Sequence, residues 1–269
     1  MAFLGPKLIL TPLLIASASL AGRRWGALLS GWLIALPLTS GPIALFIALD
    51  LGWSAGADAA TGALVGATAQ VAFAGGYAIG SRRFGWQGAL VTASAGYLVA
   101  AAVIAAFVPP YPPLLFLLAL ASIAVGLGLI RVRRPDQPLA VVQPGTWDIP
   151  ARAIVATTLV LAISGLAPII GGHVAGIVAT YPVYISVLTS FAHRLAGPAQ
   201  ALGVVRGLLL GLPGFSTFFL VVSAALPTWP IPVAFGLALA AAIAINVSIL
   251  VASTRRGGGN AAVAPTPES

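Results

Sequence analysis

The sequence predicts an all-α polytopic membrane protein of nine transmembrane helices, in which two four-helix repeats of inverted topology are joined by one extra helix. Composition is the first reason, because 59% of the 269 residues are hydrophobic, only 7% are charged and the mean hydropathy is +1.06. A soluble domain of this size would need far more polar surface. The regular length of the apolar runs and the uneven distribution of Arg and Lys are the second and third reasons.

Nine apolar runs reach the ~17 to 20 residues that a helix needs to cross a bilayer core of ~30 Å. Charged residues, prolines or glycine-rich turns separate them. The predicted spans are Pro6 to Gly22, Gly26 to Asp50, Ala59 to Gly80, Gly88 to Val108, Leu114 to Ile130, Pro150 to Ala167, Gly172 to Phe191, Gln200 to Ala224 and Pro232 to Ala252. The predicted organisation is a first repeat (1–108), an extra helix with a cytoplasmic connector (109–149), a second repeat (150–253) and a disordered tail (254–269).

The first run also has features of a secretory signal peptide. Lys7 precedes a short apolar core, and Ala16, Ser17 and Ala18 resemble a cleavage site. However, two arginines follow the core, and the segment has a counterpart later in the chain. We therefore expect a retained transmembrane helix.

The basic residues assign a side of the membrane to each loop. One set of loops contains Lys7 as its only basic residue, together with Asp50, Trp53, Asp58, the turn Pro109 to Pro113, Gly171 to His173 and Pro227 to Pro230. The other set holds eleven basic residues: Arg23, Arg24, Arg82, Arg83, Arg131, Arg133, Arg134, Arg152, Arg194, Arg255 and Arg256. Short Arg-rich loops mark the cytoplasmic face. The sequence thus predicts a bacterial inner-membrane protein with its N-terminus outside and its C-terminus in the cytoplasm.

The predicted span from Leu114 to Ile130 lies between the two repeats. Because a single span is an odd number, the second repeat enters the membrane upside down relative to the first. An ungapped offset of 145 residues pairs glycines, prolines and phenylalanines of the two halves, including Pro37 with Pro182 and Phe73 with Phe218. Close helix packing is expected at Gly62 with Gly66 and at Gly207 with Gly211.

The second half resembles a known family in the segments GIVATYPVYISVLTSFAHR (176–194) and AQALGVVRGLLLG (199–211) and in its closing span from Pro232. These segments are similar to the small four-span bacterial membrane proteins of the GlpM type. The first half, with SGWLIALPLTSGPIALFIALDLG (30–52), looks like a more diverged copy. The resemblance implies a duplicated four-span unit and no catalytic residue.

Several kinds of chemistry are not supported by the sequence. It contains no phosphate-binding loop, no HExxH or GxSxG motif and no cysteine. Its five acidic residues lie at span ends, in loops or in the tail, and His173 and His193 stand about 30 Å apart along one span, too far to share a metal. We expect both histidines to be interfacial anchors. Because these motifs are missing, neither an enzyme nor a cofactor is expected. A nucleic-acid partner is not expected either, because the basic residues behind the +8 net charge are scattered between apolar runs.

The interrupted second span of each half is the candidate substrate site. Proline removes a backbone donor, and a break inside a membrane requires polar partners. In transporters built from inverted repeats, two such breaks meet near the midplane. The candidate residues are Pro37, Thr39, Ser40, Tyr181, Pro182 and Tyr184. The alternative is a pair of structural kinks.

Arg206 is the costliest residue placed within an apolar run, so it either faces a polar cavity and contacts an anion or snorkels to the surface. Other polar residues, such as Gln70, Tyr77, Ser94 and Tyr97, either line a path or make interhelical hydrogen bonds. We predict a secondary transporter, channel or flippase for a small or lipid-linked solute. The alternative is a non-transporting scaffold or regulator of a partner enzyme, and the sequence also leaves a homo-oligomer open.

Overall fold

A computed structural model describes residues 13, 37, 39–130 and 148–258. The described part contains helices and short turns and no strand. In chain order the helices are α3 (Ser40–Leu51), α4 (Trp53–Gly80), α5 (Trp86–Phe107), α6 (Pro112–Leu129), α7 (Asp148–Ile170), α8 (Gly172–Ala179), α9 (Val183–Ala196), α10 (Pro198–Ala225) and α11 (Ile231–Gly258). The predicted span Pro6 to Gly22 apart from Leu13, about half of the second span, and the tail from residue 259 lie outside the described residues.

Six stretches of the described chain are long and apolar enough to cross a membrane, which confirms the prediction of a helical membrane protein. They are α4, α5, α6, α8 with α9, α10 and α11. Within the most apolar part of each helix, 72% of the residues of α4 and 61% of those of α10 are buried. In α5, α6 and α11 the buried share is 22%. Thus α4 and α10 form the centre, and the other three present their apolar faces outward.

Two loops are shorter than predicted. Asp50, Trp53 and Asp58 were assigned to one loop, but Asp50 lies in α3, and α4 begins at Trp53 and contains Asp58. Gly52 joins the two helices alone, with φ of 94°, a backbone conformation that glycine adopts without steric cost. Likewise, Gly171 at φ of 80° joins α7 to α8, so Gly172 and His173 are helical.

The helix boundaries of the two halves coincide at the offset of 145 residues. Both ends of α4 map onto the ends of α10, and the first residue of α5 maps onto that of α11. The junction glycines also correspond, since Gly197 has φ of 86° before α10 as Gly52 has before α4. The packing partners match as well, because α5 contacts α9 and α11 contacts α3.

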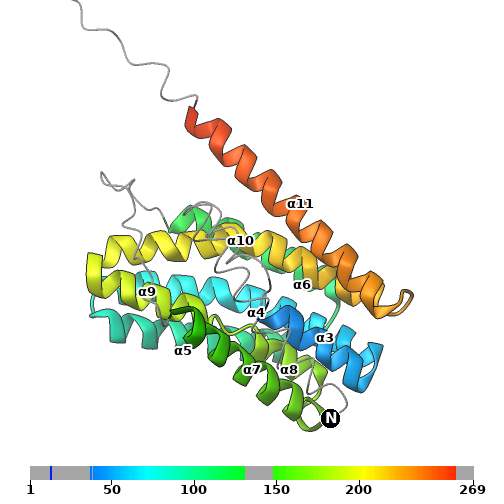
Figure 1. The fold of residues 1–269 in the computed structure, drawn as a ribbon. Helices are drawn as coiled ribbons and strands as arrows, with labels where there is room; N and C mark the ends of the chain where they lie inside the picture. Colours follow the sequence, from blue (N-terminus) through cyan, green and yellow to red (C-terminus); the bar gives the residue numbers. More distant parts are fainter. Residues whose placement is uncertain (1–12, 14–36, 38, 131–147, 259–269) are drawn as a thin grey trace, which may run out of the picture.

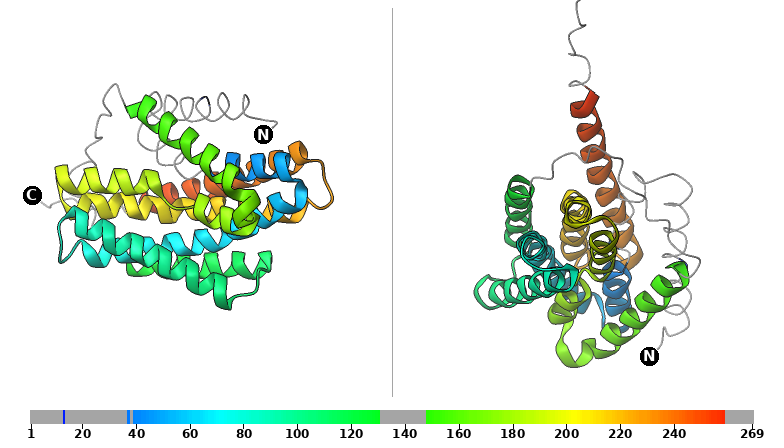
Figure 2. Two further views of the ribbon diagram at one scale, coloured as in Figure 1. Left: turned by 90° about the horizontal axis from the view of Figure 1, so that it is seen from below. Right: turned by 90° about the vertical axis from the view of Figure 1, so that its left-hand side faces the viewer.

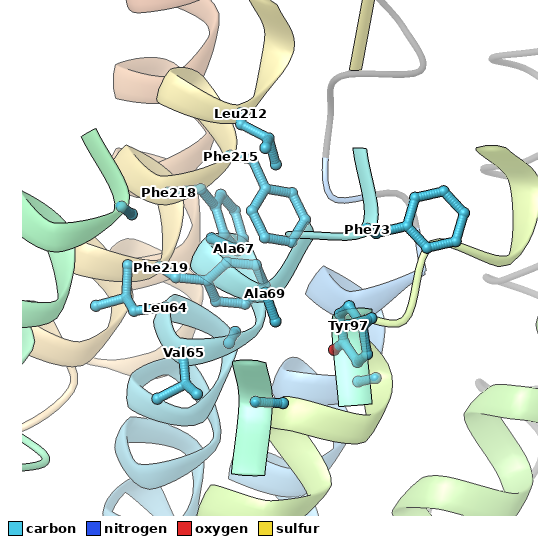
Figure 3. Close-up of a cluster of buried hydrophobic side chains, with 14 of the residues drawn as sticks. Leu64, Val65, Ala67, Ala69, Phe73, Tyr97, Leu212, Phe215, Phe218 and Phe219 are labelled. Carbon is cyan, nitrogen blue, oxygen red and sulfur yellow. The ribbon is translucent and has the colours of Figure 1, made fainter. Parts of the chain in front are cut away.

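The centre of the bundle is the pair α4 and α10, which lie side by side and run in opposite directions (Figure 1). The helix α6 contacts both of them, while α5 flanks α4 and α11 flanks α10. The right-hand view of Figure 2 shows that α11 leaves the bundle at an angle. In the core, Phe215, Phe218 and Phe219 of α10 gather beside Leu64 and its neighbours on α4 (Figure 3).

The closest contact between the halves is the crossing of α4 and α8. A Cβ atom on Gly62 would overlap the backbone carbonyl of His173, and a Cβ atom on Gly176 would overlap that of Ala59. Small residues on both helices therefore let the two backbones touch, as in other membrane helix pairs. The predicted close packing at Gly62 and Gly66 is confirmed. At Gly207 the prediction is wrong, because a Cβ atom there would meet nothing within 4 Å.

Candidate functional site

The predicted break in the second half is present between α8 and α9. Helix α8 ends at Ala179, α9 begins at Val183, and Thr180, Tyr181 and Pro182 connect them. Pro182 has no N–H to continue the helical ladder. The chain instead makes tighter turns, with the Tyr181 N–H donating to the Val178 carbonyl at 3.2 Å. Such a break leaves carbonyl groups that need other donors inside a membrane.

Side chains of the first half supply those donors. Gln70 on α4 donates from Nε2 to the Thr180 carbonyl at 2.9 Å. Tyr97 on α5 donates from its hydroxyl to the Ile177 carbonyl at 2.7 Å and lies 2.9 Å from Thr180 Oγ1. Gln70, Tyr97 and Thr180 are buried. The break in one half is therefore held by hydrogen bonds from the other half.

Tyr181 adds an aromatic contact to this arrangement. Its hydroxyl lies 2.7 Å from Ser94 Oγ on α5. Its ring meets the ring of Tyr97 edge-on at 5.3 Å between centroids and that of Phe73 edge-on at 6.3 Å. Edge-to-face pairs of this kind are favourable beyond the area that they bury, so the ring and the hydroxyl orient Tyr181 together.

A second polar contact joins the ends of α4 and α9. The Tyr77 hydroxyl lies 3.1 Å from the Thr189 carbonyl and 3.2 Å from His193 Nδ1. The Tyr77 hydroxyl donates to the Thr189 carbonyl, and its oxygen can also accept a hydrogen bond from His193 Nδ1 when that nitrogen carries the ring proton. His193 is thus bonded to the neighbouring half rather than acting only as an interfacial anchor.

We call these seven residues the break cluster: Gln70, Tyr77, Ser94, Tyr97, Thr180, Tyr181 and His193. Its groups are hydroxyls, an amide, backbone carbonyls and one imidazole. None is a carboxylate, ammonium or guanidinium. Such a set is suited to hydrogen-bond a neutral solute, because a charged one would need a countercharge in so apolar a surrounding.

The candidate residues of the first half have different surroundings. Pro37 and Ser40 are buried, Thr39 is half-buried, and the Pro37 carbonyl accepts a hydrogen bond from the Gly41 N–H at 2.9 Å. A Cβ atom on Gly41 would lie 3.5 Å from the Phe218 ring of α10. These contacts differ from those of Tyr181 and Pro182, so a single site formed by both breaks stays a prediction. In the second half, Tyr184 lies half-buried in the first turn of α9.

The break cluster also has no polar counterpart in the other half. At the offset of 145 residues, Gln70 corresponds to Phe215 and Tyr77 to Val222. Ser94 likewise corresponds to Leu239, and Tyr97 to Ala242. The two halves share their helix boundaries but not their side-chain chemistry. The polar side chains of α4 and α5 that bond the α8–α9 break are therefore replaced by apolar ones at the equivalent positions of α10 and α11.

Arg206 is separate from both breaks. From α10 its Nη1 donates to the Leu127 carbonyl at 3.1 Å and to the Ile130 carbonyl at 2.8 Å. Both carbonyls belong to the C-terminal end of α6, where helix carbonyls lack intrahelical partners and favour a cation. The guanidinium thus binds the end of the extra helix, and the anion contact stays a prediction.

Sequence reasoning did not identify how the polar residues pair. It named Gln70, Tyr77, Ser94 and Tyr97 as polar span residues, but not the groups that they bind, which lie 80 to 112 positions away along the chain. One available signal was Thr180 directly before the proline break, since a hydroxyl beside freed carbonyls is a common partner for them.

The chain matches no protein-family model, no curated protein and no solved structure. The resemblance to the GlpM-type proteins therefore stays a prediction.

Proposed function

We propose that this protein is a secondary transporter, channel or flippase that moves a small neutral or lipid-linked solute across the bacterial inner membrane. It has nine spans in this proposal, with the N-terminus outside and two inverted four-helix repeats around the extra helix α6. It acts without catalysing a reaction. Solute passes when the two halves separate at the α8–α9 break.

Three observations support the inverted repeats. The helix boundaries coincide at one offset, α4 and α10 run antiparallel, and α6 contacts both. In addition, Tyr77 near the end of α4 bonds His193 near the end of α9. Arg82 and Arg83 follow α4, and Arg194 follows His193, so the three arginines lie at the same end of the bundle. This common end agrees with the basic loops predicted for the cytoplasmic face.

The observation that carries the transport proposal is the set of hydrogen bonds between the halves at the α8–α9 break. Gln70 and Tyr97 of the first half bond Thr180 and Ile177 of the second. In membrane proteins such bonds contribute ~0.6 kcal/mol each on average. Three of them total about 2 kcal/mol, so these bonds add only about that much to the free energy of separating the halves at the break. Hydroxyl or amide groups of a solute can replace these bonds one for one.

The test is flux into liposomes that contain the purified protein, over a panel of small neutral solutes. We expect uptake of at least one solute above that of empty liposomes. Tyr97→Phe is expected to change this flux several-fold, because it removes the hydroxyl that bonds Ile177 and Thr180. Tyr111→Phe, at an exposed position, is the matched control. No flux for any solute would refute the proposal.

The second candidate function is a membrane scaffold or regulator of a partner enzyme. It is favoured by the way the polar groups of the break satisfy one another, because the break then needs no ligand to be stable. Crosslinking in native membranes followed by purification would test it. A scaffold yields the same partner in every replicate, and the absence of any reproducible partner would remove this candidate.

A further inference from the structure

Three exposed arginines lie at one end of the bundle. Arg82 and Arg83 stand in the turn between α4 and α5, and Arg194 stands in the last turn of α9. This turn and the end of α9 both lie at the left-hand end of the bundle in Figure 1 and in the left-hand view of Figure 2. Two of the arginines therefore come from the first half of the chain and one from the second half.

A hydrogen bond near these arginines holds the two helix ends together. The Tyr77 hydroxyl of α4 lies 3.2 Å from His193 Nδ1 of α9. Arg194 directly follows His193, and Arg82 follows Tyr77 by five residues, or about 7.5 Å at helical rise. The positive charges of the two halves thus lie on neighbouring helix ends and at a similar depth.

These guanidinium groups have no countercharge within the described residues. Arg206 donates to the carbonyls at the end of α6, but none of the three exposed arginines makes a hydrogen bond or ion pair with another described residue. The two acidic side chains that the structure describes, Asp50 and Asp58, lie near the start of α4, more than about 30 Å away along that helix. Like charges that are close together repel one another and attract an anion.

Exposed apolar side chains accompany the arginines. Ile79 is in the last turn of α4, Phe84 directly follows Arg83, and Leu195 directly follows Arg194. Trp86 begins α5 beside them, and tryptophan is enriched where a membrane meets water. Guanidinium groups next to exposed apolar side chains match a lipid, which has a charged phosphate and apolar acyl chains. A soluble anion would use the arginines alone.

We propose that Arg82, Arg83 and Arg194 bind the phosphate of an anionic phospholipid, whose acyl chains lie beside Ile79, Phe84 and Leu195. Guanidinium groups bind phosphate oxygens through paired N–H donors. The bound lipid contacts both halves next to the bond between Tyr77 and His193, so it stabilises the contact between the halves at this end. This lipid site does not depend on the transport of a solute.

The test is native mass spectrometry of the purified protein in detergent that contains equal amounts of phosphatidylglycerol and phosphatidylcholine. Arg82→Gln/Arg83→Gln removes the two charges of the first half, and Arg194→Gln removes the charge of the second half. Arg255→Gln/Arg256→Gln is the matched control, because it removes two charges at the end of α11, on the same predicted face of the membrane. Arg82→Lys/Arg83→Lys keeps the charge of the site.

We expect the wild type to retain phosphatidylglycerol in preference to phosphatidylcholine. Each arginine lost from the site is expected to weaken this preference about fivefold, whereas the α11 control keeps the preference of the wild type and the lysine variant keeps most of it. The melting temperature of the wild type should also rise more with phosphatidylglycerol than with phosphatidylcholine.

Three results would overturn the lipid site. The first is equal retention of both lipids by the wild type. The second is an equal loss of preference in Arg82→Gln/Arg83→Gln and in the α11 control, because the attraction would then come from the overall surface charge. The third is a melting temperature that inorganic phosphate alone raises as much as phosphatidylglycerol does, because the arginines would then bind a soluble anion.

Discussion

The crossing of α4 and α8 provides the sharpest test of the packing between the two halves. Gly62 and Gly66 lie on the same helix as Gly75, and all three can be changed to alanine. A Cβ atom on Gly62 would meet the backbone of His173, whereas one on Gly66 would meet the side chain of Thr180. A Cβ atom on Gly75 would meet nothing within 4 Å.

These surroundings set the expected free energies of unfolding. Gly62→Ala must displace the α8 backbone, so its cost falls near the top of the ~1 to 3 kcal/mol typical of overpacking. Gly66→Ala meets a side chain that can turn aside, but it disturbs the bond between Thr180 and Tyr97, so we expect about 2 kcal/mol. Gly75→Ala gains up to ~1 kcal/mol because alanine is the better helix former.

The assay is SDS-induced unfolding of the purified protein, followed by far-ultraviolet circular dichroism. We expect the midpoints to rank Gly75→Ala above the wild type, followed by Gly66→Ala and then Gly62→Ala. Gly75→Ala is the control for the substitution itself. If Gly62→Ala unfolded at or above the wild-type midpoint, the two backbones would not touch as described.

Three further predictions concern separate features. Gln70→Leu leaves the break carbonyl that it bonds without a donor, and we expect a loss of ~1 to 3 kcal/mol in the same unfolding assay, with an unchanged midpoint as the contrary result. Arg206→Met removes the donors at the end of α6 and should speed amide exchange there about tenfold, since a charged hydrogen bond contributes ~1.5 kcal/mol or more; equal exchange would contradict this role. Because the chain has no cysteine, single cysteines report cleanly on topology. The cysteines of Arg83→Cys and Arg194→Cys should react with a thiol reagent from one side of the membrane, and the cysteine of Thr228→Cys should react from the other side. If the cysteines at positions 83 and 194 reacted from opposite sides, the inverted-repeat proposal would be refuted.

Features set by neighbouring residues were predictable from the sequence. The predicted spans Gly88 to Val108, Leu114 to Ile130, Gln200 to Ala224 and Pro232 to Ala252 each start within two residues of α5, α6, α10 and α11. Apolar length and the punctuation by proline and glycine are local signals. The break at Pro182 was visible for the same reason, since a missing N–H interrupts a helix wherever proline stands.

Loop lengths were harder to predict because they depend on a single backbone angle. The acidic residues around Gly52 suggested a loop of several residues, although one glycine at positive φ suffices. Asp58 consequently lies within α4, beside α8, where its Cβ atom would be 3.3 Å from a Cβ atom on Gly172. Composition indicates that a segment is polar, but it does not say whether the polar residue follows a helix or belongs to it.

The sequence by itself determined that this protein is helical, that it belongs in a membrane, and where most of its helices begin and end. Hydrophobicity and backbone chemistry decide these properties over a few consecutive residues. Only the tertiary structure decided that Gln70 and Tyr97 close the break beside Pro182, that Arg206 binds the end of α6, and that Asn246 is buried without a partner. Each of these depends on which helices lie side by side, and residues 76 to 110 positions apart carry no local signal of their contact.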